Sequence, residues 1–374
     1  MPIFLNHCGV SKMLPASADA ARAQIDLQAQ KGSLMFQDWV EPLNDFKAGG
    51  AMLLGTTPDN VSYVKNTSEG LSLLAAGYPL QPGDEIVSYD LEYPANHYPW
   101  KVQEGRGAKL VLIQNRTHAE LCGGLIEGPG GFRFEDVESK VTSKTKIIAL
   151  SHVQFTSGFA FDLKRMGEFC KSRNIDLIVD CAQSLGSLEI YPEQMNIAAI
   201  AASGWKWLMG PVGTGVMYTS PALREKIKII FAGADLMVQG ADYLNHTWNP
   251  HTDARKFEYS THDFVGTSAL AASFKSANAF GIKRIQERGR ELQAKFLSRI
   301  DQEKYKPLLF SSENRSGIIS LVPAGRLNAE EVGKQMAVQG IVVAPRAGFV
   351  RIAPHYTNTD AEVISAADAL NELS

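Results

Sequence analysis

The chain has 374 residues, a formal net charge of −3, 45% hydrophobic residues and 21% charged residues. This length exceeds what one hydrophobic core usually serves, so a large domain with a smaller one is expected. The charge gives no support for a nucleic-acid or anionic-membrane partner, and no apolar run is long enough to predict a membrane span. The N-terminus lacks the basic region and long apolar core of a signal peptide. The four scattered cysteines show no CxxC spacing, so we expect no disulfide framework, no metal site and a cytoplasmic location.

In chain order, the first clear strands are the apolar runs at 109–113, 146–150 and 176–179. A helical pattern over 162–170 lies between the last two, with Asp162 as its expected N-cap. Strands that are apolar on both faces and joined by helices predict a mainly parallel sheet covered on both sides. The fold class is therefore α/β.

The second half of the chain predicts two more strands and then a separate α+β module. The strands are expected at 197–202 and 214–218, on either side of a Gly-Pro turn. From 268 to about 300 the pattern is that of one long helix, although two glycines interrupt it. We expect a large domain over 15–265, a small one over 266–374, and residues 1–14 near the functional site. Within the small domain the expected elements are strands at 317–322, 341–344 and 350–353 and helices at 328–339 and 360–373.

Three polar residues follow predicted strands. Asp180 ends a buried strand, at the sheet edge where open α/β folds bind ligands, and a carboxylate there needs a cation or several donors. Gln183 comes three residues later, where it can reach the other side of a ring lying over the turn. Lys206 follows the next strand, between two tryptophans that exclude water, lower the pKa of the amine and favour imine formation.

Each of these residues alone has a plainer interpretation. A strand-end aspartate is usually a turn or capping residue, and a lysine beside tryptophan commonly snorkels at the surface. Their combination is more specific. The segments Val-Asp-Cys-Ala-Gln-Ser at 179–184 and Ser-Gly-Trp-Lys-Trp-Leu-Met-Gly-Pro-Val-Gly-Thr-Gly at 203–215 resemble the class V aminotransferase family. That family includes cysteine desulfurases, isopenicillin-epimerase-like proteins, kynureninases and small-substrate transaminases, and the resemblance covers nearly the whole chain.

The resemblance implies fold type I, with a large domain built on a mainly parallel sheet of the seven-stranded type, a small C-terminal α+β domain, and a homodimer. It also implies pyridoxal 5′-phosphate (PLP) as cofactor. Lys206 is expected to carry PLP as a Schiff base and to remove the Cα proton of an amino acid. Asp180 is expected to hold the proton on the pyridine nitrogen, which PLP needs to act as an electron sink. Gln183 is expected beside the ring, and Tyr93 is expected to stack on its face.

The PLP phosphate is expected at the segment 66–70, which resembles the family's phosphate-binding turn. Thr67 and Ser68 supply hydroxyls there, and a helix N-terminus supplies free N–H groups. An ordinary helix cap is the alternative for this segment taken alone. Ser203 and the indole N–H of Trp205 are expected to add phosphate contacts.

A segment at 256–261 resembles the one that reaches the phosphate in the neighbouring subunit of the family's dimers. Thr261 is the residue expected to make this contact. Ser260 stands where the family usually has glycine, and Thr267 belongs to a second Gly-Thr pair nearby, so Thr267 is the alternative.

The substrate site is expected to include Arg351, which resembles the family's arginine for the substrate carboxylate. A guanidinium binds a carboxylate through two parallel hydrogen bonds, whereas an isolated strand arginine is commonly a surface residue. Asn6 and His7, at the start of the resemblance, are expected to complete this site.

The reaction is predicted to be transamination, because it needs a lysine base and a carboxylate anchor. Cysteine desulfuration also needs a thiolate on a mobile loop, but 340–351 contains no cysteine, and only Cys8 lies in a terminal segment able to approach. In addition, Phe155 stands where desulfurases often have asparagine. A C–S lyase, which needs no protein thiol, is an alternative. An epimerase using Tyr93, His7 or His97 as a second acid–base group is another; a non-enzymatic PLP-fold protein is disfavoured.

Overall fold

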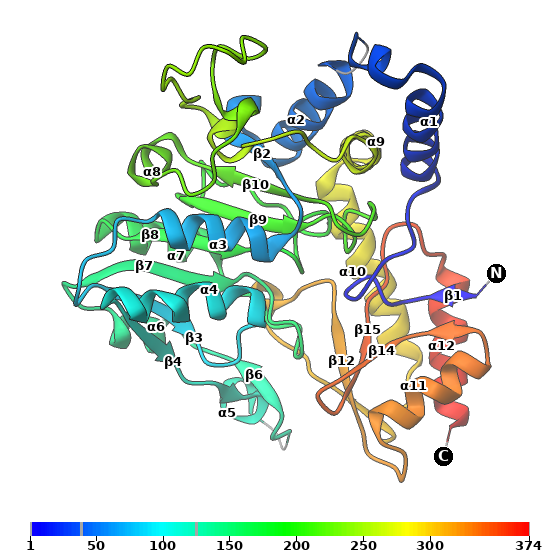
Figure 1. The fold of residues 1–374 in the computed structure, drawn as a ribbon. Coiled ribbons are helices and arrows are strands. Elements are labelled where there is room, and N and C mark those ends of the chain that lie inside the picture. The colour runs from blue at the N-terminus through cyan, green and yellow to red at the C-terminus, as the bar shows by residue number, and fades with distance from the viewer. Residues whose placement is uncertain (1, 38–39, 124–125, 374) are drawn as a thin grey trace.

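The computed structural model describes residues 2–37, 40–123 and 126–373 (Figure 1). The large domain is built on a seven-stranded sheet of order β2-β10-β9-β8-β7-β3-β4. Strand β10 runs antiparallel to both neighbours and all other pairs are parallel, which confirms the mainly parallel sheet. The strands are β2 (Val61–Val64), β3 (Glu85–Tyr89), β4 (Lys109–Ile113), β7 (Thr145–Ser151), β8 (Asp176–Asp180), β9 (Ala199–Ser203) and β10 (Gly215–Thr219).

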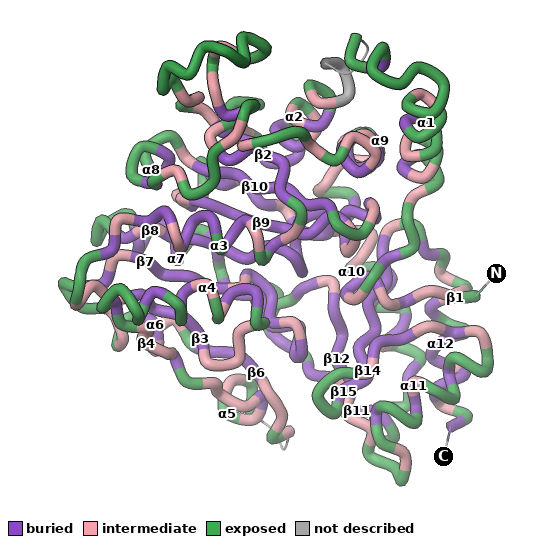
Figure 2. Tube along the Cα trace, viewed as in Figure 1, coloured by how far each residue is buried: buried purple, intermediate pink, exposed green. Residues whose placement is uncertain are grey.

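The central strands of this sheet are mostly buried, as Figure 2 shows, whereas the edge strand β4 is only partly buried. In β7, Ile148 packs into one core with Met166 of helix α7, while its neighbour Ile147 packs into the opposite core with Leu71 of α3. Alternate residues of a strand point to opposite faces, so a strand between two helical layers must be apolar throughout. The helices of this domain are α1 (Pro15–Lys31), α2 (Val40–Leu54), α3 (Thr67–Gly77), α4 (Tyr98–Lys101), α5 (His118–Cys122), α6 (Phe134–Lys140), α7 (Leu163–Ser172), α8 (Pro221–Lys226) and α9 (Phe264–Phe280). A two-stranded ribbon of β5 (Arg116–Thr117) and β6 (Pro129–Gly131) lies beside the sheet.

The small domain contains a four-stranded antiparallel sheet of order β11-β12-β15-β14. Its own core joins Leu292 of α10, Val332 of α11 and Leu370 of α12 to the sheet. The strand β1 (Ile3–Phe4) pairs in parallel with β13 at its side. The elements are α10 (Ile282–Arg299), β11 (Tyr305–Pro307), β12 (Ile319–Pro323), α11 (Ala329–Val338), β13 (Ile341–Val342), β14 (Ala344–Arg346), β15 (Phe349–Ile352) and α12 (Asp360–Glu372).

The prediction of one long helix over 268–300 is wrong. Gly281, with φ 90°, ends α9 and begins α10, because a left-handed residue cannot continue a helix. Helix α9 packs against α1 and α2 and places Phe274 in the core of the large domain, whereas α10 packs against α12. The large-domain core thus continues past residue 265, and the domain boundary itself stays a prediction. The strand expected at 341–344 is also two short strands, β13 and β14.

Residues 2–14, here called the N-terminal strap, run from the small-domain sheet to the turn that carries Lys206. At one end, Leu5 N donates to Val342 O at 2.9 Å. At the other, Ser11 N donates to Trp205 O at 2.8 Å and Leu14 N to Met209 O at 3.0 Å. The strap therefore contacts both domains beside the candidate site.

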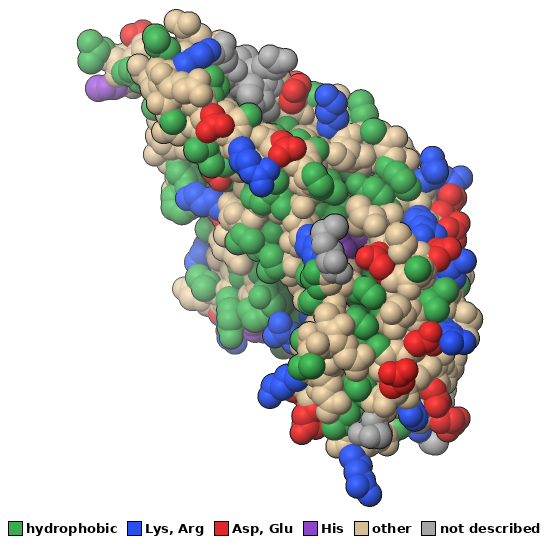
Figure 3. All heavy atoms as spheres, turned by 90° about the vertical axis from the view of Figure 1, so that its right-hand side faces the viewer, with side chains coloured by type: hydrophobic (Ala, Val, Ile, Leu, Met, Phe, Trp, Pro, Cys, Tyr) green, Lys and Arg blue, Asp and Glu red, His purple; other side chains and the backbone are tan. Residues whose placement is uncertain are grey.

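The surface carries charges of both signs. On the face shown in Figure 3, acidic and basic side chains are interspersed. In the described part of the chain, no helix is both long and apolar enough to cross a membrane.

Candidate active site

Lys206 lies in a tight turn directly after β9. Gly204 is required in this turn, because a Cβ there would lie 2.6 Å from Thr214 Oγ1. Burial lowers the pKa of the Lys206 ammonium, and the nearby carboxylate of Asp180 partly opposes this shift. The fold therefore holds a partly desolvated amine at the carboxyl edge of the sheet, near the carboxyl group of Asp180.

Asp180 is the last residue of β8, and only 4% of its surface is exposed. Its Oδ1 accepts a hydrogen bond from Ala182 N at 2.8 Å, and it forms no ion pair with any described residue. Burial raises the pKa of this carboxyl group, and Lys206 opposes the rise. A buried carboxylate with so few partners fits a cationic ring nitrogen such as that of PLP.

The start of helix α3 and the end of strand β9 together form a polar cradle. The Oγ1 of Thr67 and the Oγ of Ser203 lie 2.8 Å apart, so the structure brings these two predicted phosphate ligands together. Asn66 caps the helix by accepting from Glu69 N at 2.8 Å, and Ser68 is exposed in the first turn. Two hydroxyls beside a helix N-terminus suit a phosphate group.

Gln183 and Trp207 connect this centre to the strap. Gln183 Nε2 donates to Cys8 O at 2.9 Å, and its Oε1 accepts from Trp207 Nε1 at 3.1 Å. One end of the amide thus holds the strap and the other end holds Trp207 of the lysine turn, and a contact with the PLP ring stays a prediction. Trp205 is half-buried, and its indole N–H makes no hydrogen bond within the described residues.

Tyr93 lies over the lysine. The Nζ of Lys206 is 5.5 Å from the centre of its ring, and the ring of Phe155 packs edge-on against it at 5.3 Å. The tyrosine is 46% exposed, so part of its surface is left uncovered by the described residues. This is the position from which an aromatic side chain can cover a planar cofactor.

Glu92 fixes the loop that carries Tyr93. Its carboxyl group accepts from Ser151 N at 2.7 Å and from the Ser151 hydroxyl, at the end of β7. Burial raises the pKa of Glu92 to about 8, with a further contribution from Asp180, so this group is largely uncharged at neutral pH. Sequence reasoning missed Glu92. Its position directly before Tyr93 is a signal that could have found it.

Arg351 lies in β15 and is almost fully buried. Its Nη1 donates to Phe155 O at 2.6 Å and its Nε to Ala344 O at 3.3 Å, and it forms no ion pair with any described residue. Burial lowers the pKa of the guanidinium. A buried cation held only by carbonyl groups leaves its charge available for an anionic ligand.

His7 is buried in the strap, where burial lowers the pKa of its imidazole well below the usual value. The hydroxyl of Ser11 donates to Lys206 O at 2.6 Å, so it accepts from His7 Nδ1 at 2.9 Å. This fixes the tautomer of His7 and ties it to the lysine turn, where it positions the strap. A direct contact of His7 with substrate stays a prediction.

Asn6 and Cys8 complete this end of the strap. The thiol of Cys8 lies 3.7 Å from Asn6 Oδ1 and is 2% exposed. Burial raises the pKa of the thiol, while the positive charges of Arg351 and Lys206 oppose the rise, which shows that Cys8 lies near both. A buried, protonated thiol is a poor nucleophile.

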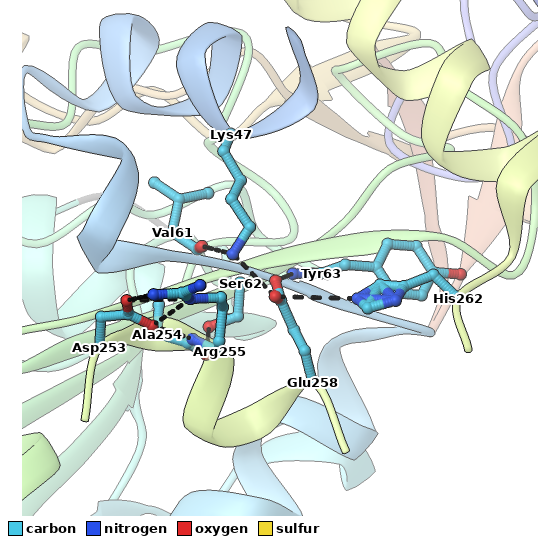
Figure 4. Close-up of polar contacts among 9 residues, drawn as sticks. All are labelled: Lys47, Val61, Ser62, Tyr63, Asp253, Ala254, Arg255, Glu258 and His262. Carbon is cyan, nitrogen blue, oxygen red and sulfur yellow. Dashed lines mark hydrogen bonds and ion pairs between the residues drawn. The ribbon is translucent and has the colours of Figure 1, made fainter. Parts of the chain in front are cut away.

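The segment that carries Thr261 is anchored by Glu258 (Figure 4). Its carboxylate lies 2.7 Å from Lys47 Nζ and 3.7 Å from His262 Nε2, and it accepts from Tyr63 N at 3.1 Å. Thr261 is exposed and makes no hydrogen bond within the described residues. Thr267 is fully buried and donates to Asp263 O at 2.6 Å, so the geometry favours Thr261 for contact with another molecule.

Other kinds of site are not visible in the described residues. They contain no cluster of three or more His, Cys, Asp or Glu placed to hold a metal ion. The four cysteines, which lie within the described ranges, are free thiols.

Comparison with known proteins identifies the family that this chain resembles in sequence. The profile of the family "Aminotransferase class-V" matches residues 31–359. A relative from Methanothermobacter thermautotrophicus, named probable cysteine desulfurase, is 25% identical over 87% of this chain and 82% of its own. YcbU of Bacillus subtilis, named an uncharacterized aminotransferase, is 22% identical over 98% and 93% of the two chains.

The fold matches solved structures over its full length. A variant of C-DES with glycine covalently linked to the PLP cofactor superposes with a TM-score of 0.90, covering 100% of this chain and 97% of that one at 18% identity. At this identity the likeness shows the fold, which is fold type I. The match of the family profile, together with the half-buried Lys206 near the buried Asp180, leads to one conclusion: this chain belongs to the class-V aminotransferase family and is a PLP-dependent protein.

Proposed function

We propose that this protein is an aminotransferase that acts on α-amino acids. The observation that carries the proposal is the buried Arg351, which has no carboxylate partner among the described residues. Its positive charge also lowers the pKa of Cys8 and of Lys206. An α-carboxylate bound there would complete the charge balance of the site. The name of the relative YcbU supports the same reaction.

The residues of the site divide the work of such a reaction. PLP, when bound, withdraws electrons from the Cα of an attached amino acid and makes its proton acidic. The amine of Lys206 would take that proton from Cα and deliver it to the cofactor carbon bonded to the amino nitrogen, helped by a lowered pKa that keeps the amine neutral more of the time. Asp180 would hold the ring nitrogen in its protonated form, Arg351 would orient the carboxylate, and Tyr93 would cover the ring.

A C–S lyase is the second candidate, supported by the relative named probable cysteine desulfurase. A desulfurase route through a protein thiolate is disfavoured, because the stretch 340–351 contains no cysteine and Cys8 is buried with a raised pKa. β-Elimination needs no protein thiol, so it is the form of C–S cleavage that this site could perform.

The two functions are separated by their products. The holoenzyme is incubated with single amino acids and an added α-keto acid, using a ¹⁵N-labelled donor. Transamination yields labelled amino acid from the acceptor. Elimination from cysteine or its conjugates yields pyruvate, ¹⁵N-labelled ammonia and a thiol or sulfide, with no label in an amino acid formed from the acceptor. This result would replace the proposed function with the second candidate.

Arg351→Ala is expected to raise KM for amino acids by roughly 30-fold or more, since a desolvated charge pair contributes a few kcal/mol and about 1.4 kcal/mol is tenfold. Steady-state kinetics measures this change. Amines that lack a carboxylate serve as the internal control and should be unaffected, as should the affinity for PLP. Arg351→Lys should recover only part of the loss, because an ammonium cannot form the paired hydrogen bonds. Normal kinetics for Arg351→Ala would make this arginine structural.

We also propose a homodimer in which Thr261 of each subunit contacts the phosphate in the neighbouring site. Thr261 is exposed, and it lies three residues after Glu258, which is anchored by Lys47, and this placement supports the arrangement. Thr261→Ala is expected to weaken PLP binding about tenfold, since a hydrogen bond to a charged group contributes roughly 1.5–3 kcal/mol. Titration of the apoprotein with PLP measures the effect, and Ser260→Ala is the matched control.

Mixed dimers test whether the sites are shared. Subunits carrying Lys206→Ala are combined with subunits carrying Thr261→Ala. If sites are composite, one site in each mixed dimer has both native residues and regains wild-type affinity and activity. If each site is formed within one subunit, mixing restores nothing, and the protein would sediment as an active monomer or as a dimer with independent sites.

A further inference from the structure

A second arginine lies on the same face of the small-domain sheet as Arg351. In the β14–β15 hairpin, Arg351 pairs with Ala344 and Phe349 pairs with Arg346. Directly opposed residues of antiparallel strands point to one face, as do alternate residues along a strand. Arg346 and Arg351 therefore share a face as diagonal neighbours, for which the typical separation is about 7–8 Å.

The hairpin turn fixes this register. Its two central residues, Ala347 and Gly348, have φ values of 50° and 83°. Left-handed conformations at both positions are those of the tight two-residue turn that joins adjacent antiparallel strands. Arg346 is thus the last paired residue of β14, at the rim of the sheet rather than in a flexible loop.

This shared face meets the large domain at the candidate site. Arg351 Nη1 donates to Phe155 O at 2.6 Å, and Ser320, which pairs with Arg351, donates through Oγ to Thr156 O at 2.6 Å. At the rim, Phe349 contacts the large domain near Gly128, where a Cβ would lie 2.5 Å from its ring. The side of the sheet that carries Arg346 is therefore the side that faces Lys206.

The charge of Arg346 reaches the site. It contributes to lowering the pKa of Lys206 and of Arg351, as a nearby cation does. The side chain is exposed and forms no hydrogen bond or ion pair with any described residue. Two guanidinium groups thus face a site in which Asp180 is the nearby acid and Cys8 is a protonated thiol. A substrate with one carboxylate would leave one of these cations unpaired.

We propose that Arg346 is a specificity residue that binds a second anionic group at the end of the substrate side chain. Arg351 takes the α-carboxylate, and Arg346 takes a side-chain carboxylate or sulfinate, so the preferred substrates are acidic amino acids. This inference rests on the proposed reaction at Lys206 and names its substrate class. A guanidinium fork suits both groups, because each presents two oxygens that can accept parallel hydrogen bonds.

The first test compares substrates of the same shape and different charge. The wild-type holoenzyme is expected to favour glutamate over glutamine, and aspartate over asparagine, by about tenfold or more in kcat/KM, equivalent to about 1.4 kcal/mol. Arg346→Gln should remove this preference by slowing the acidic substrates while the amides change little. Arg326→Gln is the matched control, because Arg326 is also exposed in the small domain and unpaired within the described residues.

The second test needs no turnover. Binding of succinate and glutarate to the PLP-loaded enzyme is compared with binding of butyrate by calorimetry. The wild type should bind the dicarboxylates at least about tenfold more tightly than butyrate. In Arg346→Gln the affinity for the dicarboxylates should fall to the affinity for butyrate. Equal use of acids and amides, or an equal effect of the variant on both, overturns the inference and leaves the aminotransferase proposal standing. If no amino group is transferred at all, the proposed function fails. In that case the binding test still decides this inference, which is overturned if Arg346→Gln binds the dicarboxylates as tightly as the wild type does.

Discussion

Lys206→Ala is expected to abolish activity and the covalent attachment of PLP together. The amine that lies beside Asp180 and under Tyr93 belongs to this residue, and its burial keeps it reactive. After reduction with borohydride, intact-mass measurement should show the added mass of the cofactor in the wild type and none in the variant. The loss of activity should be complete, because the same amine binds the cofactor and moves the Cα proton.

Lys65→Ala is the matched control for this experiment. Lys65 precedes the phosphate cradle in sequence, but it is exposed and lies 3.6 Å from Glu69 in a surface pair. Its removal should leave both the covalent adduct and the activity intact. A borohydride-trapped adduct that persists in Lys206→Ala would mean that another amine carries the cofactor.

Asp180→Asn is expected to lower kcat by about a hundredfold or more, in the range found when one preorganised electrostatic contact is removed. The amide keeps an oxygen that can accept from Ala182 N, so the turn after β8 should remain intact. What it loses is the negative charge that holds a proton on the PLP ring nitrogen. Steady-state rates and the thermal midpoint of unfolding are measured together.

Asp180→Ala completes the comparison, because it removes both the charge and the hydrogen bond to the turn. It should be as inactive as Asp180→Asn and less stable by about 1 kcal/mol, the typical contribution of one hydrogen bond. Near-native turnover in Asp180→Asn would assign this residue to the turn alone. Low activity in Asp180→Ala together with native activity in Asp180→Asn would likewise assign Asp180 to the turn, because only the hydrogen bond would then matter.

The centre of the sheet could be predicted from sequence because its strands contain uninterrupted apolar runs, at 147–150 and 177–179. Strands β7 and β8 were found this way, and with them the strand ends that place Asp180 and Lys206. Strands β2 and β3 were missed, since buried serines, Ser62 and Ser88, interrupt their apolar pattern. Helix α1 was missed for a related reason: its buried residues are polar, so it shows no apolar stripe.

The contacts that organise the site depend on tertiary packing and could not be read from local patterns. Arg351 is held by the backbone carbonyl group of Phe155, and every residue type carries such a group. Gln183 was expected beside the cofactor, yet its amide also binds the backbone of Cys8, which is 175 positions away in the chain. Arg346 needed the strand register before its direction was known. Gly281 illustrates the same limit, because helix propensity alone does not say which domain core each half of a helix will join.

The N-terminal strap makes the two halves of the site mechanically dependent on each other. Its β1 end is bonded to β13, just before the strand that leads to Arg346, and Ser11 at the other end is bonded to the backbone of Lys206. A hinge rotation of the small domain must therefore either break these bonds or drag the lysine turn with it. The strap is a continuous length of backbone, so it limits how far the strands that carry Arg346 and Arg351 can move away from Lys206. Any closure of the small domain on a substrate would therefore displace the proposed base as well.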